Sequence, residues 1–242
     1  MRYPAGPPPD LPERFAGRPS LDASKCMDDC RQCVAACPTA ALVSDPAGRA
    51  VGLDTGRCLF CRQCAAACPA SAITFSADYR MAASRREDLV LRDASRPPAV
   101  TLDEAARRLF GRSLRLRQVS AGGCGACEAD TNVLGTVGWD LGRFGIQFVA
   151  SPRHADGLLV TGPVTENMRP ALKKTYDAVP WPKLVIAVGA CAISGGPYLD
   201  HPEVHNGAAS LLPVDLLVPG CPPHPLTLLD GLLALLNVPR TA

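Results

Sequence analysis

The sequence predicts an α/β protein in two parts: a small cysteine-rich α+β domain, followed by a three-layer domain with a mainly parallel β-sheet. Two observations predict this. Eight of the twelve cysteines lie between residues 26 and 68, and the other four lie between residues 124 and 221. From residue 113 onward, short apolar runs alternate with helical segments, as βα units do in a sheet that is covered on both faces.

Composition narrows the classes of protein. The 242 residues are 47% hydrophobic and carry a net charge of +2, so no large basic face indicates a nucleic acid partner. The stretch MRYPAGPPPDLPERF has no apolar segment typical of a secretory signal, and no run approaches about 18 apolar residues, so we expect no membrane span. We therefore expect a cytoplasmic, reducing setting, in which metal binding is the leading use of the thiols.

The chain divides into four expected segments. Residues 1–20 are rich in proline and are expected to form an extended arm that lies across a partner. Residues 21–78 form the cysteine-rich domain. Residues 79–112 form a charged linker with one helix, predicted by the capping-box pattern that starts at Thr101 and by Gly111 at its end. Residues 113–242 form the α/β domain.

The cysteine-rich domain is an internal repeat. Residues 26–38 read CMDDCRQCVAACP and residues 58–69 read CLFCRQCAAACP. Structural zinc is the alternative use of such cysteines, but zinc ribbons pair C-x2-C knuckles that are well separated in sequence. Here the three cysteines from 58 to 64 lie close together. The repeat resembles the bacterial two-cluster ferredoxins, whose C-x2-C-x2-C-x3-C-P run sends its fourth cysteine to the other cluster.

The resemblance implies two [4Fe–4S] clusters with crossed ligands. Cluster 1 takes Cys26, Cys30, Cys33 and Cys68, and cluster 2 takes Cys58, Cys61, Cys64 and Cys37. The first copy has one residue more between its first two cysteines. We interpret it as a small bulge that keeps all four ligands, with a [3Fe–4S] cluster as the alternative. Asp28 and Asp29 are expected to disfavour the reduced, more negative form of cluster 1.

The alternation after residue 113 predicts the elements of the α/β domain in turn. The expected strands are 114–119, 146–150, 157–161, 184–188 and 214–218, and the expected helices are 129–137, 166–178 and 225–237. Runs such as DGLLV and KLVIAV are short and continuously apolar, as in strands that are buried on both faces. The resulting fold is similar to flavodoxin.

Each of the last four cysteines comes shortly after an expected strand: Cys124 and Cys127, then Cys191, then Cys221. Open α/β sheets bind ligands at the carboxyl ends of their strands. The glycines beside these cysteines let the backbone approach a bulky inorganic group and direct N–H groups toward sulfur. Four thiols that converge on this edge of the sheet predict a metal or cluster site.

The motifs around these cysteines resemble a known family. GGCGACEAD, DGLLVTGPVTENM, AVGACAISGG and VPGCPPHP are together similar to the small subunit of membrane-bound [NiFe] hydrogenases and to the homologous subunit of complex I. The resemblance covers residues 113–238. It implies that Cys124, Cys127, Cys191 and Cys221 bind one [4Fe–4S] cluster, the proximal cluster. Cys124 and Cys127 are separated by two residues, which is the hydrogenase-like arrangement, because the complex I subunit carries adjacent cysteines there.

Two further residues in these motifs have open interpretations. Glu128 matches an acidic position of the family. It is either a proton-handling group near the nickel site or a carboxylate that stabilises the first turn of its helix. His224 stands where an arginine is more often found after PGCPP, and a histidine there could make the properties of the cluster pH-dependent.

The fusion of the two domains implies consecutive electron carriers. The leading hypothesis is an electron-transfer subunit, without a substrate site of its own, of an energy-converting [NiFe] hydrogenase of the formate hydrogenlyase type. Three [4Fe–4S] clusters are its implied cofactors. Its implied partners are a nickel–iron large subunit, membrane subunits and an upstream electron donor, which would place the chain at the inner face of the cell membrane. The alternatives are a complex I-like subunit that passes electrons to quinone, a stand-alone ferredoxin-type carrier and a zinc-stabilised interaction module.

Overall fold

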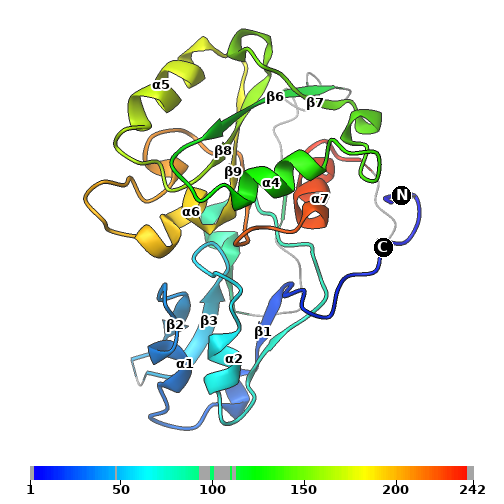
Figure 1. Cartoon of the computed structure of the whole chain (residues 1–242). Helices are drawn as coiled ribbons and strands as arrows, with labels where there is room; N and C mark the ends of the chain where they lie inside the picture. Colours follow the sequence, from blue (N-terminus) through cyan, green and yellow to red (C-terminus); the bar gives the residue numbers. More distant parts are fainter. Residues whose placement is uncertain (1–2, 47, 93–98, 101–109, 111–112, 239–242) are drawn as a thin grey trace.

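The structure, a computed structural model, describes residues 3–46, 48–92, 99–100, 110 and 113–238. In Figure 1 the N-terminal cysteine-rich part forms the lower lobe and the α/β part the upper lobe, with the loops of both meeting between them. The expected capping box at Thr101 and the expected helix end at Gly111 lie outside the described residues.

The N-terminal domain is built from two small antiparallel sheets and two short helices, as the α+β prediction requires. One sheet pairs β1 (Pro19–Leu21) with β4 (Ile73–Phe75). The other has the order β2 (Leu42–Ser44), β3 (Ala50–Asp54), β5 (Val90–Leu91). A 3-10 turn, Ala23–Lys25, follows β1. β5 comes from the segment expected to be a linker, and it completes this sheet.

The two short helices repeat each other. α1 (Gln32–Ala35) and α2 (Gln63–Ala67) both begin inside a CRQC run. Each is too short to be stable alone, so it depends on tertiary packing. The core that supports them is small and includes Leu42, Leu53 and Ile73 together with the buried cysteines of the helices. Apolar burial alone therefore gives this domain little stability, as expected for a domain that a cofactor holds together.

The C-terminal domain contains a five-stranded sheet in the order β10-β9-β8-β6-β7, with every adjacent pair parallel. The strands are β6 (Leu114–Ser120), β7 (Ile146–Phe148), β8 (Gly157–Thr161), β9 (Leu184–Val188) and β10 (Leu216–Val218). This is the doubly wound order of flavodoxin, so the predicted fold class is confirmed. The order reverses between β6 and β8, where such sheets bind ligands.

Helices cover both faces of this sheet: α4 (Ala126–Val133) and α7 (Pro225–Leu235) on one, α5 (Arg169–Ala178) and α6 (Gly189–Ser194) on the other. Side chains of the strands alternate between two separate cores. Leu159 and Ile186 pack toward α7, whereas Leu158 and Val185 pack toward α5. Four 3-10 turns lie in the connections: Leu141–Phe144, Pro152–His154, Gly196–Tyr198 and Ala208–Ser210.

The segment between the domains pairs with both of them. Ala83 exchanges backbone hydrogen bonds of 3.0 and 2.8 Å with Leu217 at the edge of the parallel sheet. A 3-10 helix, Arg86–Leu89, follows and leads directly into β5, which pairs with β3 in the N-terminal domain. The same short segment therefore extends one sheet and completes another, which fixes the two domains relative to each other.

The N-terminal arm packs on its own chain at Tyr3, a contact that the sequence does not predict. Tyr3 is buried in the core of the C-terminal domain, where its hydroxyl donates a 2.8 Å hydrogen bond to the carboxylate of Asp230. Arg143 donates a hydrogen bond of 2.5 Å to the carbonyl oxygen of Tyr3. In Figure 1 the arm, in dark blue, runs from this domain down to β1. The buried tyrosine anchors the arm on its own chain.

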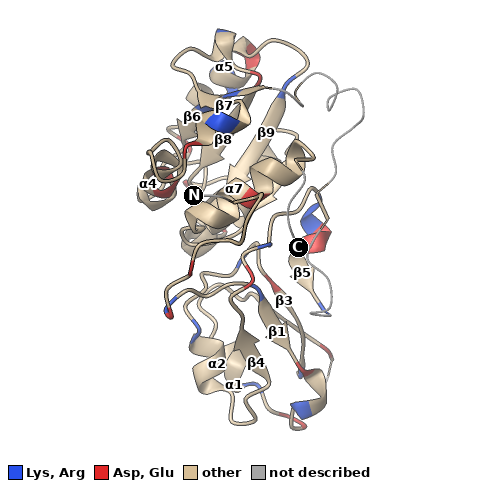
Figure 2. Ribbon diagram, turned by 90° about the vertical axis from the view of Figure 1, so that its right-hand side faces the viewer, with Lys and Arg blue, Asp and Glu red and all other residues tan. Residues whose placement is uncertain are grey.

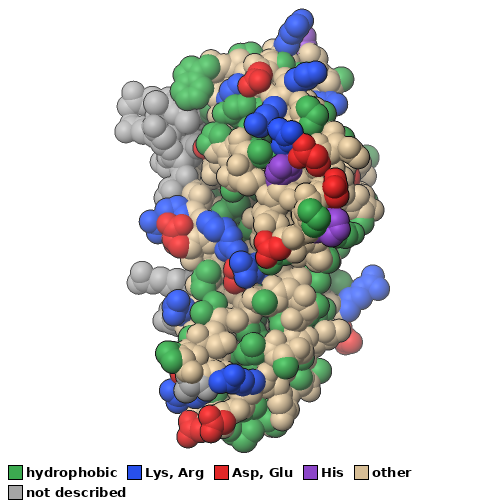
Figure 3. Space-filling view, turned by 90° about the vertical axis from the view of Figure 1, so that its left-hand side faces the viewer, with side chains coloured by type: hydrophobic (Ala, Val, Ile, Leu, Met, Phe, Trp, Pro, Cys, Tyr) green, Lys and Arg blue, Asp and Glu red, His purple; other side chains and the backbone are tan. Residues whose placement is uncertain are grey.

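Charges of both signs are spread over the surface. Figure 2 shows basic and acidic residues scattered along the ribbon of both lobes, and Figure 3 shows charged side chains interspersed with hydrophobic ones on the opposite face. Among the residues that the structure describes, no helix is long and apolar enough to cross a membrane.

Candidate functional site

Two hollows in the N-terminal domain are each lined by four cysteines. The first hollow is lined by Cys26, Cys30, Cys33 and Cys68. The second hollow is lined by Cys37, Cys58, Cys61 and Cys64. Each hollow takes three cysteines from one copy of the repeat and one from the other. The structure thus brings together the two crossed sets that the sequence predicts as ligands.

The crossing cysteines, Cys37 and Cys68, have equivalent backbone surroundings. The N–H of Ala41 points at the sulfur of Cys37 at 3.2 Å, and the N–H of Ala72 points at the sulfur of Cys68 at 3.3 Å. In both copies the residue before that alanine has a positive φ, near +50°, which turns the N–H toward the sulfur. An N–H donated to sulfur stabilises the thiolate form, which is the form that binds metal.

The additional residue in the first copy is taken up in a tight turn. The N–H of Cys30 donates to the carbonyl oxygen of Met27 at 3.3 Å, and Asp29 has φ +59°. Its counterpart in the second copy, Phe60, has nearly the same φ, +55°. The loops therefore converge again before their second cysteine, and Cys26 remains on the wall of the first hollow.

The third group of cysteines is Cys124, Cys127, Cys191 and Cys221, at the carboxyl ends of β6, β9 and β10. Burial raises the pKa of Cys127 to about 12, and the neighbouring thiols of the group add to the rise. The pKa of Cys191 is raised to about 11, first by burial and then by Cys221 and Cys124. The four thiols are therefore close enough to interact electrostatically, as the sequence predicts.

Glycines make room for these sulfurs. Gly189 has φ +89°, and a Cβ there would lie 2.5 Å from the sulfur of Cys127. A Cβ at Gly196 would lie 2.8 Å from the sulfur of Cys191. Any larger residue would displace a thiol, so the glycines fix the shape of the site.

The donor sets fit iron–sulfur clusters better than single ions. Among the described residues, no three His, Cys, Asp or Glu side chains converge closely enough to hold one metal ion. Four thiols that are spaced too widely for one ion suit a cluster, because each thiolate binds a different iron atom of the cluster. Burial also raises the pKa of Cys58 to about 12 and that of Cys64 to about 11. Coordination offsets this cost, because a bound metal deprotonates its thiol ligands.

The three groups of cysteines form a linear series in space. Cys33 of the first hollow is among the neighbours that raise the pKa of Cys64 in the second hollow. Cys61 of the second hollow is among the neighbours that raise the pKa of Cys221, after burial and Cys124. Cys33 and Cys64 also pack in one core cluster, and Leu59 lines a hollow together with Cys221, so the second hollow lies between the first hollow and the third group.

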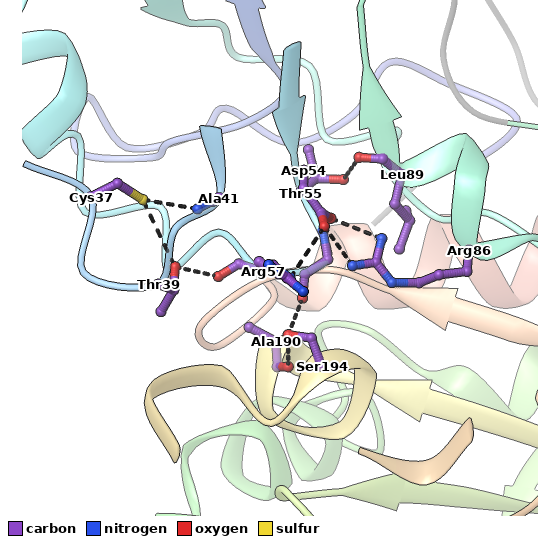
Figure 4. A network of polar contacts seen from close by, with 11 residues as sticks. Cys37, Thr39, Ala41, Asp54, Thr55, Arg57, Arg86, Leu89, Ala190 and Ser194 are labelled. Carbon is purple, nitrogen blue, oxygen red and sulfur yellow. Dashed lines mark hydrogen bonds and ion pairs between the residues drawn. The ribbon is translucent and has the colours of Figure 1, made fainter. Parts of the chain in front are cut away.

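Hydrogen bonds to two successive backbone carbonyls connect the second hollow with α6, the helix that carries Cys191 (Figure 4). The hydroxyl of Thr39 contacts the sulfur of Cys37 at 3.9 Å and donates to the carbonyl oxygen of Arg57 at 2.7 Å. The adjacent carbonyl oxygen, of Gly56, accepts a 2.9 Å hydrogen bond from Ser194 on α6. Sequence reasoning missed Thr39 and Ser194, because isolated hydroxyl residues carry no spacing signal.

An ion pair supports the same junction. The carboxylate of Asp54 is buried and accepts two hydrogen bonds from the guanidinium of Arg86, at 2.8 and 2.6 Å. It also accepts the N–H of Gly56 at 2.9 Å. This bidentate pair holds the 3-10 helix of the connecting segment against the loop that precedes Cys58.

Glu128 is held by two strand ends. Its carboxylate accepts hydrogen bonds from Ser120 at 2.5 Å and from Thr161 at 2.6 Å. Burial alone would raise the pKa of Glu128, but these hydrogen bonds outweigh it and lower the pKa below the usual 4.5. An ionised carboxylate in the first turn of α4 favours the helix-stabilising interpretation over proton handling.

His224 caps α7. Its Nδ1 accepts the N–H of Leu226 at 3.1 Å, and its ring packs edge-on against Phe15 and Trp139. Burial lowers the pKa of His224, and the nearby carboxylate of Asp130 opposes part of that shift. The imidazole of His224 is therefore neutral in the folded protein at neutral pH.

Comparisons with known proteins identify the family. Residues 124–235 match the family described as NADH ubiquinone oxidoreductase, 20 Kd subunit, and residues 20–72 match the 4Fe-4S dicluster domain. A subunit of the NADH-quinone oxidoreductase of Clostridium beijerinckii is 49% identical over 114 residues, which cover 47% of this chain and 68% of that protein. The chain belongs to this 20 kDa subunit family.

A hydrogenase subunit is also among the relatives of this chain. The probable membrane-bound hydrogenase subunit mbhJ of Pyrococcus furiosus is 41% identical over 130 residues, which cover 54% of this chain and 78% of that protein. A chain of the membrane-bound sulfane sulfur reductase, an archaeal respiratory membrane complex, superposes with a TM-score of 0.49 and 33% identity over 56% of this chain and 75% of that chain. The resemblance stated from the sequence is confirmed: the chain is an electron-transfer subunit of a complex I-like or membrane-bound hydrogenase complex.

Proposed function

We propose that this chain relays electrons through three [4Fe–4S] clusters in a [NiFe] hydrogenase of the formate hydrogenlyase type. The observation that carries the proposal is the spatial order of the three cysteine groups. The second hollow neighbours the first where Cys33 and Cys64 pack in one core cluster, and it neighbours the third group where Leu59 and Cys221 line one hollow. A linear order of this kind suits transport from one end of the molecule to the other.

The ligand sets of this proposal follow the geometry. The first hollow supplies Cys26, Cys30, Cys33 and Cys68, the second supplies Cys37, Cys58, Cys61 and Cys64, and the third group supplies Cys124, Cys127, Cys191 and Cys221. Bound iron–sulfur clusters supply one-electron chemistry. The residues of the chain fix the positions of the clusters and donate N–H groups to the sulfurs of Cys37 and Cys68.

The spacing of two cysteines supports the hydrogenase assignment. Cys124 and Cys127 are separated by two residues, one of which is Gly125 at φ +85°. This is the spacing of the hydrogenase-like arrangement. The partner would then be a nickel–iron large subunit that contacts the exposed Cys124 and Cys221 edge, with membrane subunits holding the complex at the inner face of the cell membrane and an upstream donor serving the first hollow.

A complex I-like subunit that passes electrons to quinone is the second candidate. The 49% identity to the Clostridium beijerinckii protein favours it as much as the 41% identity to the hydrogenase protein favours the first. The two candidates share the wiring within this chain and differ in the electron acceptor.

An activity assay on the native complex separates the candidates. The complex is purified without oxygen through a tag on this chain, reduced, and assayed in parallel for hydrogen production and for quinone reduction. Hydrogen production that a Cys221→Ser variant abolishes supports the hydrogenase. Quinone reduction without hydrogen production contradicts it and supports the complex I-like candidate.

A further inference from the structure

The two CRQC runs adopt different conformations at their arginine. Arg31, in the first copy, has φ −122° and an exposed side chain. Arg62, in the second copy, has φ +61° and is half-buried. The left-handed region is unfavourable for a residue with a Cβ, so surrounding contacts must hold Arg62 in it. Because the two runs are identical in sequence, those contacts come from outside the run.

The N-terminal arm provides one of them. Nη2 of Arg62 donates a hydrogen bond to the carbonyl oxygen of Phe15. The ring of Phe15 packs edge-on against His224, with centroids 5.3 Å apart, so the arm is seated between the two domains. The arm thus reaches the loop that carries Cys61 at the point where this loop faces Cys221.

The arm is fixed immediately after Phe15. The N–H of Gly17 donates to the carbonyl oxygen of Ser76 at 2.9 Å. Arg18 forms an ion pair of 2.9 Å with Asp78, and both side chains are largely buried. A Cβ at Gly17 would lie 2.4 Å from the carbonyl oxygen of Asp78. Only glycine therefore lets the arm approach this closely.

Arg62 also lies at the second hollow. Arg62 lines that hollow together with its four cysteines, whereas Arg31 is not among the described residues that line the first hollow. The Nε of Arg62 is buried and has no hydrogen-bond partner among the described residues. A buried guanidinium N–H without an acceptor is costly, which indicates an acceptor within the hollow.

We propose that Arg62 donates an N–H and a positive charge to the cluster in the second hollow, and that residues 15–18 of the arm hold Arg62 there. This inference rests on the proposed function. A cluster becomes more negative on reduction, so a nearby cation and an N–H donor favour its reduced form. The first hollow has no matching cation from its own CRQC run. Arg62 therefore raises the reduction potential of the second cluster, which favours electron movement from the first hollow toward the second.

The matched pair Arg62→Gln and Arg31→Gln tests this, because it makes the same change in each copy. The full chain is purified without oxygen and titrated reductively, with the clusters followed by electron paramagnetic resonance. A Cys30→Ser variant identifies the signal of the first cluster. Arg62→Gln is expected to shift the reduction equilibrium of the second cluster about tenfold toward the oxidised form, about 59 mV for one electron, with iron content unchanged. Arg31→Gln is expected to leave that cluster unchanged.

The arm is tested by Gly17→Ala, with Gly138→Ala as its control, because a Cβ added at Gly138 meets nothing within 4 Å. Gly17→Ala is expected to shift the second cluster in the same direction as Arg62→Gln, and Gly138→Ala to shift nothing. If the Arg62→Gln variant loses iron, the Gly17→Ala variant tests the inference instead, since it leaves the arginine in place.

Two results overturn the inference: potentials that do not respond to Arg62→Gln or Gly17→Ala, or an equal response of the second cluster to Arg31→Gln. A different result, the absence of cluster signals from the unsubstituted chain, contradicts the proposed function itself. The two failures are therefore distinguishable.

Discussion

Ser194 on α6 donates a 2.9 Å hydrogen bond to the carbonyl oxygen of Gly56, 138 positions earlier in the chain. The same hydroxyl lies 3.1 Å from the carbonyl oxygen of Ala190, in the turn that carries Cys191. Gly56 is two residues from Cys58. One buried hydroxyl thus connects the backbone next to a cysteine of the second hollow with the helix that carries a cysteine of the third group.

Replacing Ser194 with alanine should loosen the contact between the domains. One buried hydrogen bond is lost and the Gly56 carbonyl loses its partner, so we expect a loss of about 1–2 kcal/mol in the free energy of unfolding. Ser210→Ala is the matched control, because its hydroxyl bonds Gly207 within the C-terminal domain. Electron transfer between the domains should slow in Ser194→Ala and not in Ser210→Ala. Equal rates in the two variants would contradict a positioning role of Ser194.

The Asp54–Arg86 pair should contribute more to stability than a neighbouring surface pair. Arg86→Ala leaves the buried carboxylate of Asp54 without its bidentate partner, for an expected loss of about 2–3 kcal/mol in the free energy of unfolding. Arg85→Ala removes only surface pairs, with Asp88 and Glu87, for an expected loss below about 1 kcal/mol. Chemical denaturation of both variants measures the difference. Equal losses would show that the junction does not depend on this ion pair.

His224 should make the stability of the chain pH-dependent. Its pKa in the folded state is lowered by burial, so the unfolded state binds more protons once the pH falls toward about 6.5. Stability contributed by the neutral ring is therefore present above that pH and decreases as the pH falls toward the folded pKa. Protonation also removes the acceptor for the Leu226 N–H.

Thermal unfolding of a His224→Asn variant checks the pH dependence, because asparagine retains a capping oxygen but does not titrate. Between about pH 7.5 and about pH 5.5, its midpoint should fall less than that of the unsubstituted chain. His154→Asn, at an exposed position, should behave like the unsubstituted chain. A His224→Asn variant with undiminished pH dependence would refute the assignment.

Glu128→Gln should preserve activity. The amide oxygen of glutamine accepts the same hydroxyls of Ser120 and Thr161, and only the charge at the start of α4 is lost, which costs less than about 1 kcal/mol in the free energy of unfolding. Hydrogen production or quinone reduction should stay within about threefold of the unsubstituted complex, since general acid–base catalysis contributes at least about a hundredfold. A loss of a hundredfold with the clusters intact would instead identify Glu128 as a proton-handling group.

The elements predicted best from sequence are those set by continuous apolar runs. β8 and β9 have the predicted bounds, because DGLLV and KLVIAV are buried on both faces. α6 was not predicted: GACAIS is short, begins with glycine at a positive φ, and depends on packing against the sheet. The predicted helix at 129–137 begins three residues earlier, at Ala126, since Gly125 in the left-handed region starts it.

The candidate site was predictable as far as spacing carried information. The repeated cysteine runs and the cysteines after strands are visible as patterns, and the structure brings each set together. The different conformations of Arg31 and Arg62 were not predictable, because the CRQC runs are identical and the difference arises from the arm. The anchoring of the arm on its own chain was also not predictable, since no local pattern shows that Tyr3 and Phe15 pack on distant parts of the chain.

Metal analysis of the native complex tests the central claim most directly. The complex is purified without oxygen through a tag on this chain, and iron is also measured on the isolated chain. Three [4Fe–4S] clusters should give about twelve iron atoms per chain, and a hydrogenase partner about one nickel per complex. About eight iron atoms on the isolated chain would contradict the third cluster. Abundant iron without nickel would contradict the hydrogenase assignment and leave the complex I-like alternative in its place.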